Sequence, residues 1–350
     1  TRPFAIVCEP PDAAPGETVT VTLHCYEPQP SAGEVSWMLV LDYNEDLYGE
    51  QAVERRIIDL DQLATIDDMV YDNEGLGTLT FEFVVPQNTL LVTSALEDRF
   101  TEPLPDAVRQ LFQPAHADYL TRAEIDGFLA RVDPAALDPE SLAWVQSVSD
   151  RFACQIRLRA SLRSGIDLTV TKNLTVRYSS RLGSDNVNQN PTVNWVAVLA
   201  VHHSDLEDPD DIGRYVVDTT YVYHRDPARQ DTTPIAVDRN LTYYLQVDHD
   251  PVPYLSPLGN LQTEDHDYNW YFARLYSSNS DRNFYLNETG DDKPDIGELE
   301  EIVRFDPPPG PDAKQVRVFV VVRDYRLEWY QYNFVPGAAY VTVPVAFTFP

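Results

Sequence analysis

The stretch Cys8-Glu-Pro-Pro-Asp-Ala-Ala-Pro-Gly-Glu-Thr-Val-Thr-Val-Thr-Leu-His-Cys25 decides the fold class of this chain. Three prolines and Gly16 interrupt its first half, as turn residues between strands do. Its second half alternates apolar with polar residues, and the apolar ones are Val19, Val21, Leu23 and Cys25. Because successive side chains of a strand point to opposite faces, this alternation predicts a strand with one buried face.

The same alternation recurs along the chain, at Phe152–Leu162, in Val193, Trp195, Ala197 and Leu199, and in the apolar run Val316–Arg323. The 20 Tyr, 14 Phe and 27 Pro favour strands and loops over long helices. A length of 350 residues suits about two domains. The sequence therefore predicts a mainly β protein with two cores.

A helical interruption is predicted between the strands of the first domain, at about 103–150. Thr121-Arg-Ala-Glu124 has the pattern of a capping box, in which the Thr hydroxyl and the Glu carboxylate each bind a backbone amide. Asp138 before Pro139 is typical of a second helix start. Strand alternation then resumes at Phe152, so we expect an insertion into the first domain.

The polar, turn-rich residues 183–191 have no core positions and predict a linker. The expected domains are therefore residues 1–182, with the helical insertion 103–150, and residues 192–350.

Net charge limits the partners of the chain. Asp and Glu number 56 against 26 Lys and Arg, which gives −30 at pH 7. Such a surface repels nucleic acid, and it favours basic partners or divalent cations. No apolar run approaches the roughly 20 residues of a membrane helix. Because the sequence begins at Thr1, we interpret it as a processed product whose lipid anchor, if it has one, lies upstream.

The three cysteines leave three alternatives open. A hairpin centred near Gly16 and Glu17 would place Cys8 opposite Cys25, at disulfide distance. Cys154 also lies on an apolar strand face, so Cys25–Cys154 competes with the first pairing, and all three residues remaining thiols is the third alternative. A disulfide would indicate an oxidising compartment.

Several segments resemble immunoglobulin-like domains of predicted secreted or cell-envelope lipoproteins of Gram-negative bacteria. The similar segments are Phe4–Thr22, Asn188–Pro191 before a strand, and Val318–Asp324 followed by a strand around Trp329. Cys25 followed by Trp37 also resembles the Cys-then-Trp spacing of immunoglobulin domains. The resemblance implies two immunoglobulin-like β-sandwiches in the periplasm, at the outer membrane surface or outside the cell. It implies no activity, because this group has no assigned functional residues.

Two kinds of metal site are compatible with the sequence. Asp291, Asp292, Asp295 and Glu298 lie near the spacing of a calcium loop, although Pro294 interrupts it. Asp205–Asp211 is a second acidic segment of this kind. The triplets Asp248-His249-Asp250 and Asp265-His266-Asp267 have the residue types of a transition-metal site or an acid–base pair. In each case the alternative is a solvated acidic loop, and the expected cofactor is none or calcium.

Aromatic residues gather in two places, and about half of each set should point outward. They are Tyr325, Trp329, Tyr330 and Tyr332 near the end of the chain, and Trp270 and Tyr271 on an earlier strand. Exposed aromatic residues mark protein contacts or sugar stacking. The first hypothesis is a non-enzymatic accessory subunit of a larger envelope or extracellular assembly. The second is a carbohydrate-binding module, with or without calcium, and the third is an envelope hydrolase that uses an Asp–His pair.

Overall fold

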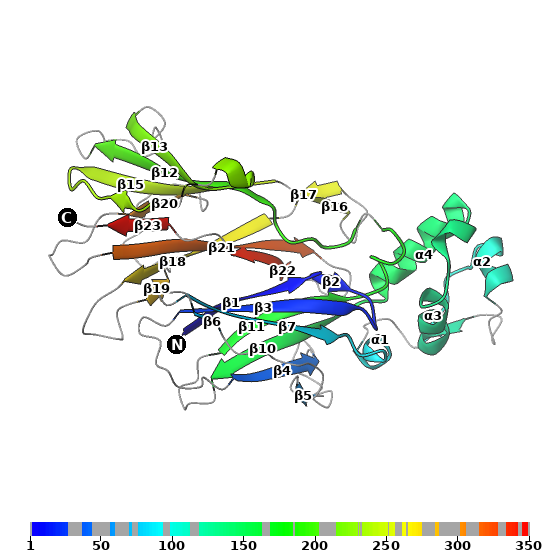
Figure 1. The fold of residues 1–350 in the computed structure, drawn as a ribbon. Helices are drawn as coiled ribbons and strands as arrows, with labels where there is room; N and C mark the ends of the chain where they lie inside the picture. Colours follow the sequence, from blue (N-terminus) through cyan, green and yellow to red (C-terminus); the bar gives the residue numbers. More distant parts are fainter. Residues whose placement is uncertain are drawn as a thin grey trace.

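The computed structural model describes residues 2–26, 37–43, 57–59, 70–71, 76–93, 99–112, 119–162, 169–184, 186–202, 215–229, 231, 233–250, 252–255, 261–263, 265–274, 284–286, 302–305, 315–327, 334–341 and 345–348. Strands dominate this part of the chain, which confirms the prediction of a mainly β protein. Figure 1 shows the strands in several layers, with helices α2, α3 and α4 gathered at one end.

Two sheets form the first half of the chain. One has the order β1-β3-β7-β6, with bounds Arg2–Glu9, Thr18–Tyr26, Leu76–Val84 and Val70–Tyr71. The other has the order β2-β11-β10-β4-β5, with bounds Asp12–Ala13, Thr169–Val176, Cys154–Leu162, Trp37–Tyr43 and Ile57–Asp59. β1 pairs with β3 antiparallel, whereas β2 pairs with β11 parallel. The chain therefore changes sheets at Pro10 and Pro11, neither of which has a backbone N–H to donate to a ladder.

Helices lie between the strands β7 and β10. In chain order the elements are α1 Thr89–Thr93, β8 Arg99–Phe100, α2 Asp106–Leu111, β9 Leu120–Thr121, α3 Arg122–Leu129, the 3-10 helix η2 Pro134–Ala136 and α4 Pro139–Arg151. The predicted capping box is present, because Thr121 Oγ1 accepts from the Glu124 amide at 3.3 Å and Glu124 Oε2 accepts from the Thr121 amide at 2.8 Å. Asp138 caps α4 by accepting from the Ser141 amide at 3.0 Å, also as predicted.

The helices share one hydrophobic core with the strands of the first half. Leu129 and Val145 belong to the same buried cluster as Val21, Phe83 and Ile156. Removing the helices from the sheets would therefore expose apolar surface on both sides.

The second half contains two larger sheets. The order β13-β12-β15-β20 has bounds Val216–His224, Val193–His202, Leu241–His249 and Ile302–Phe305. The order β14-β23-β21-β18-β19 has bounds Ile235–Ala236, Val345–Thr348, Gln315–Leu327, Asp265–Arg274 and Phe284–Leu286, and β22, Phe334–Val341, also pairs with β21. A short hairpin, β16 Pro253–Leu255 with β17 Leu261–Thr263, and the 3-10 helix η5 Pro227–Arg229 complete this half.

A second core lies between these sheets. It includes Val196 and Val198 of β12, Leu245 of β15, Val320 of β21 and Phe347 of β23. The alternation in the sequence predicts that Val193 and the odd-numbered residues after it share one face, toward the core. The ladder shifts by one residue between Val193 and Trp195, so the even-numbered residues face the core instead.

Among the described helices, none combines the length and the apolar composition that a membrane span requires, and α4, the longest, has 13 residues.

Candidate functional site

A buried arginine lies where the two halves of the chain meet. Arg177 follows β11 and is 0% exposed. Its Nε donates to Asp12 Oδ2 at 2.7 Å, and its Nη1 is 3.7 Å from Asp150 Oδ1. Asp12, on β2, is also fully buried. Since a guanidinium keeps its charge in proteins, its burial requires carboxylates and carbonyls arranged around it.

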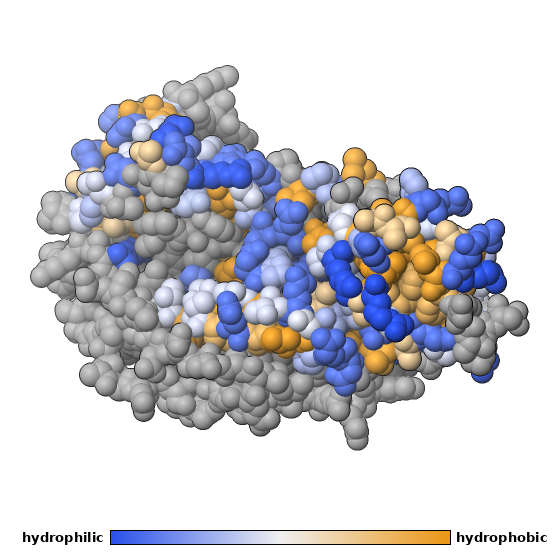
Figure 2. Space-filling view, turned by 45° about the vertical axis from the view of Figure 1, so that its right-hand side comes forward, coloured by the Kyte–Doolittle hydropathy of each residue, from blue (hydrophilic) through white to orange (hydrophobic). Residues whose placement is uncertain are grey.

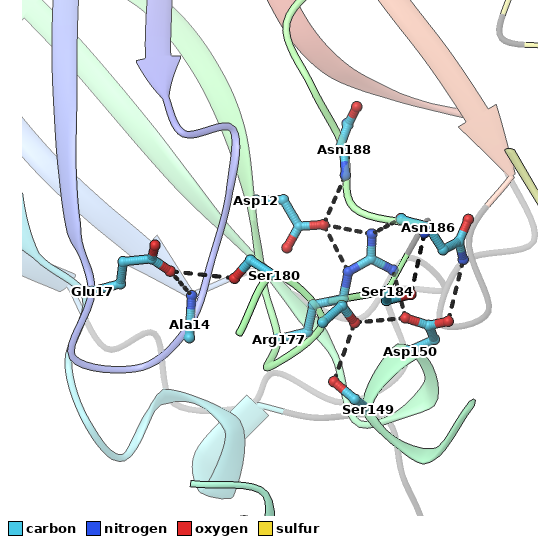
Figure 3. Close-up of polar contacts among 11 residues, drawn as sticks. Asp12, Ala14, Glu17, Ser149, Asp150, Arg177, Ser180, Ser184, Asn186 and Asn188 are labelled. Atoms are coloured by element: carbon cyan, nitrogen blue, oxygen red, sulfur yellow. Dashed lines mark hydrogen bonds and ion pairs between the residues drawn. The ribbon is translucent and has the colours of Figure 1, made fainter. Parts of the chain in front are cut away.

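The same cluster binds the segment that connects the two halves (Figure 3). Arg177 Nη2 donates to the carbonyl oxygen of Asn186 at 2.6 Å. The backbone amide of Asn188 donates to Asp12 Oδ2 at 3.1 Å, and Asn190 Nδ2 donates to the carbonyl oxygen of Cys8 at 2.9 Å. The residues predicted as a linker are thus hydrogen-bonded to the first half. We call Asp12, Asp150, Arg177 and the linker residues Asn186, Asn188 and Asn190 the junction network.

The end of α4 also joins the junction network. Ser179 Oγ donates to Asp150 Oδ1 at 2.6 Å, and the hydroxyls of Ser149 and Ser179 are 3.1 Å apart. Asn186 Nδ2 donates to the other Asp150 oxygen at 3.4 Å. The helical segment, the first sheets and the connecting segment therefore meet in one hydrogen-bonded group.

The second half contacts the first half through a strand. β22 packs against β1 and β11. On the other side of the connecting segment, the Asp250 amide donates to the Thr192 carbonyl oxygen at 3.0 Å. Asn194 Nδ2 lies 3.1 Å from Asp248 Oδ2 and 2.8 Å from Asp250 Oδ1. Within the second half, these hydrogen bonds fix the residues that directly follow the connecting segment.

The two Asp-His-Asp triplets come together. His249 ends β15 and His266 lies near the start of β18, and their ring centroids are 3.9 Å apart at an angle of 52°. The Tyr268 hydroxyl lies 3.0 Å from His249 Nδ1. Within the described residues, no group of three His, Cys, Asp or Glu side chains is placed to hold a metal ion. The structure thus brings together two imidazoles that the sequence analysis treated as separate candidates.

The predicted opposition of Cys8 and Cys25 is wrong. In the β1–β3 ladder Cys8 lies opposite Val21, and Cys25 lies opposite Pro3. The reason is that β2 leaves for the other sheet, which lengthens the connection and moves the register. All three cysteines are described, and no disulfide joins Cys25 to either Cys8 or Cys154. Burial raises the pKa of the Cys8 thiol to about 12, so it stays protonated and unreactive.

The predicted contact surface is only partly described. Trp270 is 4% exposed and belongs to the second core, so including it in that surface was wrong. Alternation turns this residue inward, toward the facing sheet. Tyr271 and Tyr325 lie on β18 and β21, opposite Phe319 and Asp265. Trp329, Tyr330 and Tyr332 lie outside the described residues, as do the calcium candidates Asp291, Asp292, Asp295, Glu298 and Asp205–Asp211.

A different aromatic pair, not predicted from the sequence, lies on β12 and β13. The rings of Trp195 and Tyr221 meet edge to face, with centroids 5.8 Å apart, and Tyr221 is 41% exposed. Beside them, Arg225 Nη1 lies 3.2 Å from Asp250 Oδ2, and the Arg225 amide donates to the Asn194 carbonyl oxygen at 2.7 Å. The even-numbered residues of β12 face the core, so Trp195 lies on the outer face of the strand. This outward position could be predicted only once the register of β12 was known.

The helical end of the molecule exposes apolar side chains. Leu111 of α2 is 57% exposed and Leu91 of α1 is 38% exposed. Figure 2 shows apolar residues gathered over this end, bordered by hydrophilic ones. In the same segment, Trp144 packs edge to face on Phe100 with centroids 6.1 Å apart. We call the surface around Leu111 of α2 the helical apolar surface.

Hydrogen bonds fix the helices that form this end. Tyr178 Oη donates to Asp126 Oδ1 at 2.9 Å, and burial raises the pKa of both groups. Arg151 Nη2 donates to Glu102 Oε2 at 2.7 Å, which lowers the pKa of that carboxyl. These hydrogen bonds fix α3 and the end of α4, which belong to the same helical segment as α2 and its exposed leucine.

No family model matches the chain, and no curated protein does. Among solved structures, the adhesin InvE of Yersinia pseudotuberculosis is similar over 99% of this chain and 60% of its own chain, with 11% identity and a TM-score of 0.19. A TM-score this low assigns neither a fold nor a function to the chain, which spans 60% of the length of that structure.

Proposed function

We propose that the chain is a non-enzymatic cell-envelope or extracellular protein that acts as a structural or accessory subunit through protein contacts. It consists of two immunoglobulin-like β-sandwiches, residues 1–182 and 192–350, joined by residues 183–191. The helices between 103 and 150 are an insertion into the first sandwich.

The strand order supports this architecture. In the first half, β1 pairs with β3 while β2 crosses to pair in parallel with β11. In the second half, β14 likewise pairs in parallel with the last strand, β23. Two buried clusters, one within residues 6–182 and one within 193–347, support two separate cores. Antiparallel sheets packed face to face are the architecture of immunoglobulin-like domains.

The helical apolar surface is the single observation that carries the contact role. Its supporting helices share the first core and are tied to the junction network, so the segment is ordered without a partner. Leu111 on this ordered segment is 57% exposed, and Figure 2 shows further apolar residues gathered over the same end. Exposed apolar patches on ordered proteins mark protein contacts.

A photo-crosslinking amino acid at position 111 tests this proposal in the native cells. We expect one crosslinked protein band from Leu111, and none from Val84, a matched control on β7 that is 50% exposed. Equal crosslinking from both positions, or none from either together with a monomeric native mass, would contradict the proposal.

A carbohydrate-binding role is the second candidate. It is favoured by the half-buried Trp195 and the exposed Tyr221, which pair beside Asp248, Asp250 and Asn194, since sugars stack on aromatic rings and accept and donate hydrogen bonds at their rims. A glycan array tests it: binding that Trp195→Ala abolishes and Leu111→Ser leaves unchanged would favour this role over the first. Absence of binding by the unmodified protein would remove it.

A further inference from the structure

Strand β13 differs from the other strands at the ends of sheets. A terminal strand leaves backbone N–H and C=O groups along one side without a ladder partner. The terminal strands β2, β5, β6, β14, β19 and β20 are two to four residues long. β1 and β22 have eight residues each, and they pack against one another. β13 has nine residues, and in the described part of the chain only β12 and η5 pack closely against it.

The side chains of β13 are exposed as well. Val217 is 48% exposed and Tyr221 is 41% exposed. Asp218 and Thr219 are also exposed. The ladder with β12 shifts near both ends of β13, which leaves a regular stretch over Asp218–Tyr221. Its sequence has neither the lysine nor the proline that commonly protects such strands from pairing with another chain.

We propose that β13 is a strand-addition site for an extended, basic segment of a partner protein. In strand addition, backbone hydrogen bonds supply affinity and alternate side chains supply specificity. This inference rests on the proposed contact function and names a second site for it, apart from the helical apolar surface.

Charge selects the occupant. A second copy of the chain would carry the same net charge of −30, and two such molecules repel each other. Asp218, in the middle of the exposed stretch, is the only charged residue in β13 apart from the titratable His224. A segment that alternates Lys or Arg with apolar residues would pair with Asp218 and pack against Val217 and Tyr221.

A synthetic peptide tests the site. The probe is Lys-Val-Lys-Thr-Lys-Tyr-Lys-Val-Lys, and the control peptide has Glu in place of every Lys. We expect the basic peptide to bind, and to slow hydrogen exchange of backbone amides within 216–224. Val217→Lys and Thr219→Lys should each weaken binding at least tenfold. Leu261→Lys, at a position 74% exposed on β17, adds the same charge elsewhere and should leave binding within about twofold.

Three outcomes would overturn the proposal. One is no binding of the basic peptide, and another is equal weakening by Val217→Lys and Leu261→Lys, which would indicate attraction by net charge alone. The third is a dimer in sedimentation that Thr219→Lys dissociates, which would assign the strand to a second copy. None of these changes the crosslinking expected from Leu111, so the two proposals fail separately.

Discussion

Folded proteins usually bury apolar side chains and expose charged ones, and the junction network and the helical apolar surface each do the opposite. At the junction a charged pair, Arg177 and Asp12, is fully buried, whereas on the helices Leu111 is 57% exposed. A buried ion pair is costly to desolvate, and an exposed leucine gains nothing from folding. Both features are connected through α4. The comparison indicates a division of roles, in which the junction fixes the connecting segment and the helices present a surface.

Replacing Arg177 with Met should have the largest effect. The variant leaves Asp12 buried without its counterion, so the free energy of unfolding should fall by about 3–5 kcal/mol in urea denaturation. The double variant Asp12→Leu with Arg177→Met should lose less than the single one, because no charge remains buried. Arg151→Met, which breaks the partly exposed pair with Glu102, should cost about 1 kcal/mol, well below the loss at Arg177. Equal losses for Arg177→Met and Arg151→Met would break the comparison.

A buried titratable group away from the junction should respond to pH. Burial lowers the pKa of His24 on β3 from 6.5 to about 4. Between pH 4 and 6.5 the unfolded chain therefore binds a proton at His24 that the folded chain does not bind. The contribution of neutral His24 to the free energy of unfolding is complete above pH 6.5 and is lost as the pH falls toward 4. Thermal denaturation should show stability falling by up to about 1.4 kcal/mol per pH unit in this window. His24→Gln should remove that part of the slope, and identical slopes in both proteins would contradict the assignment.

The capping box provides a smaller test within the helical segment. Thr121→Ala removes the acceptor for the Glu124 amide and should cost about 1 kcal/mol in urea denaturation. Thr121→Ser keeps the hydroxyl and is the matched control. A loss in one cooperative transition is expected, because the helices share the first core, and a separate early transition would show that they fold apart from it.

Changing the helical apolar surface should affect stability least. Leu111→Ser should alter the free energy of unfolding by no more than about 0.5 kcal/mol, since the side chain is mostly in solvent. The same variant should abolish co-purification of the protein that crosslinks to position 111. A loss of stability above about 2 kcal/mol would show that Leu111 is a core residue, and the contrast with the junction would disappear.

Local patterns in the sequence predicted the long strands β3, β10, β12 and β21 and both helix caps. Thr121, Glu124 and Asp138 act on amides within three residues, so their roles are visible in the sequence itself. The register of β1 and β3 was not predictable in this way, because it depends on β2 pairing with β11 more than 150 residues later. Arg177, Asp12 and the paired histidines His249 and His266 were missed as clusters for the same reason. Asp12 and Arg177 are 165 residues apart although β2 and β11 are neighbours in one sheet, and His249 and His266 lie on strands of different sheets, so the proximity in each cluster exists only after the chain has folded.

The most direct test of a fixed junction is a distance distribution between spin labels on the two halves. Val84→Cys and Val217→Cys place labels on exposed positions of β7 and β13, while Cys8, Cys25 and Cys154 are buried from the reagent. Pulsed electron paramagnetic resonance should give one narrow distribution, and Asn190→Ala, which removes the hydrogen bond to the Cys8 carbonyl, should broaden it. A broad distribution in the protein with an intact junction, unchanged by Asn190→Ala, would contradict the account.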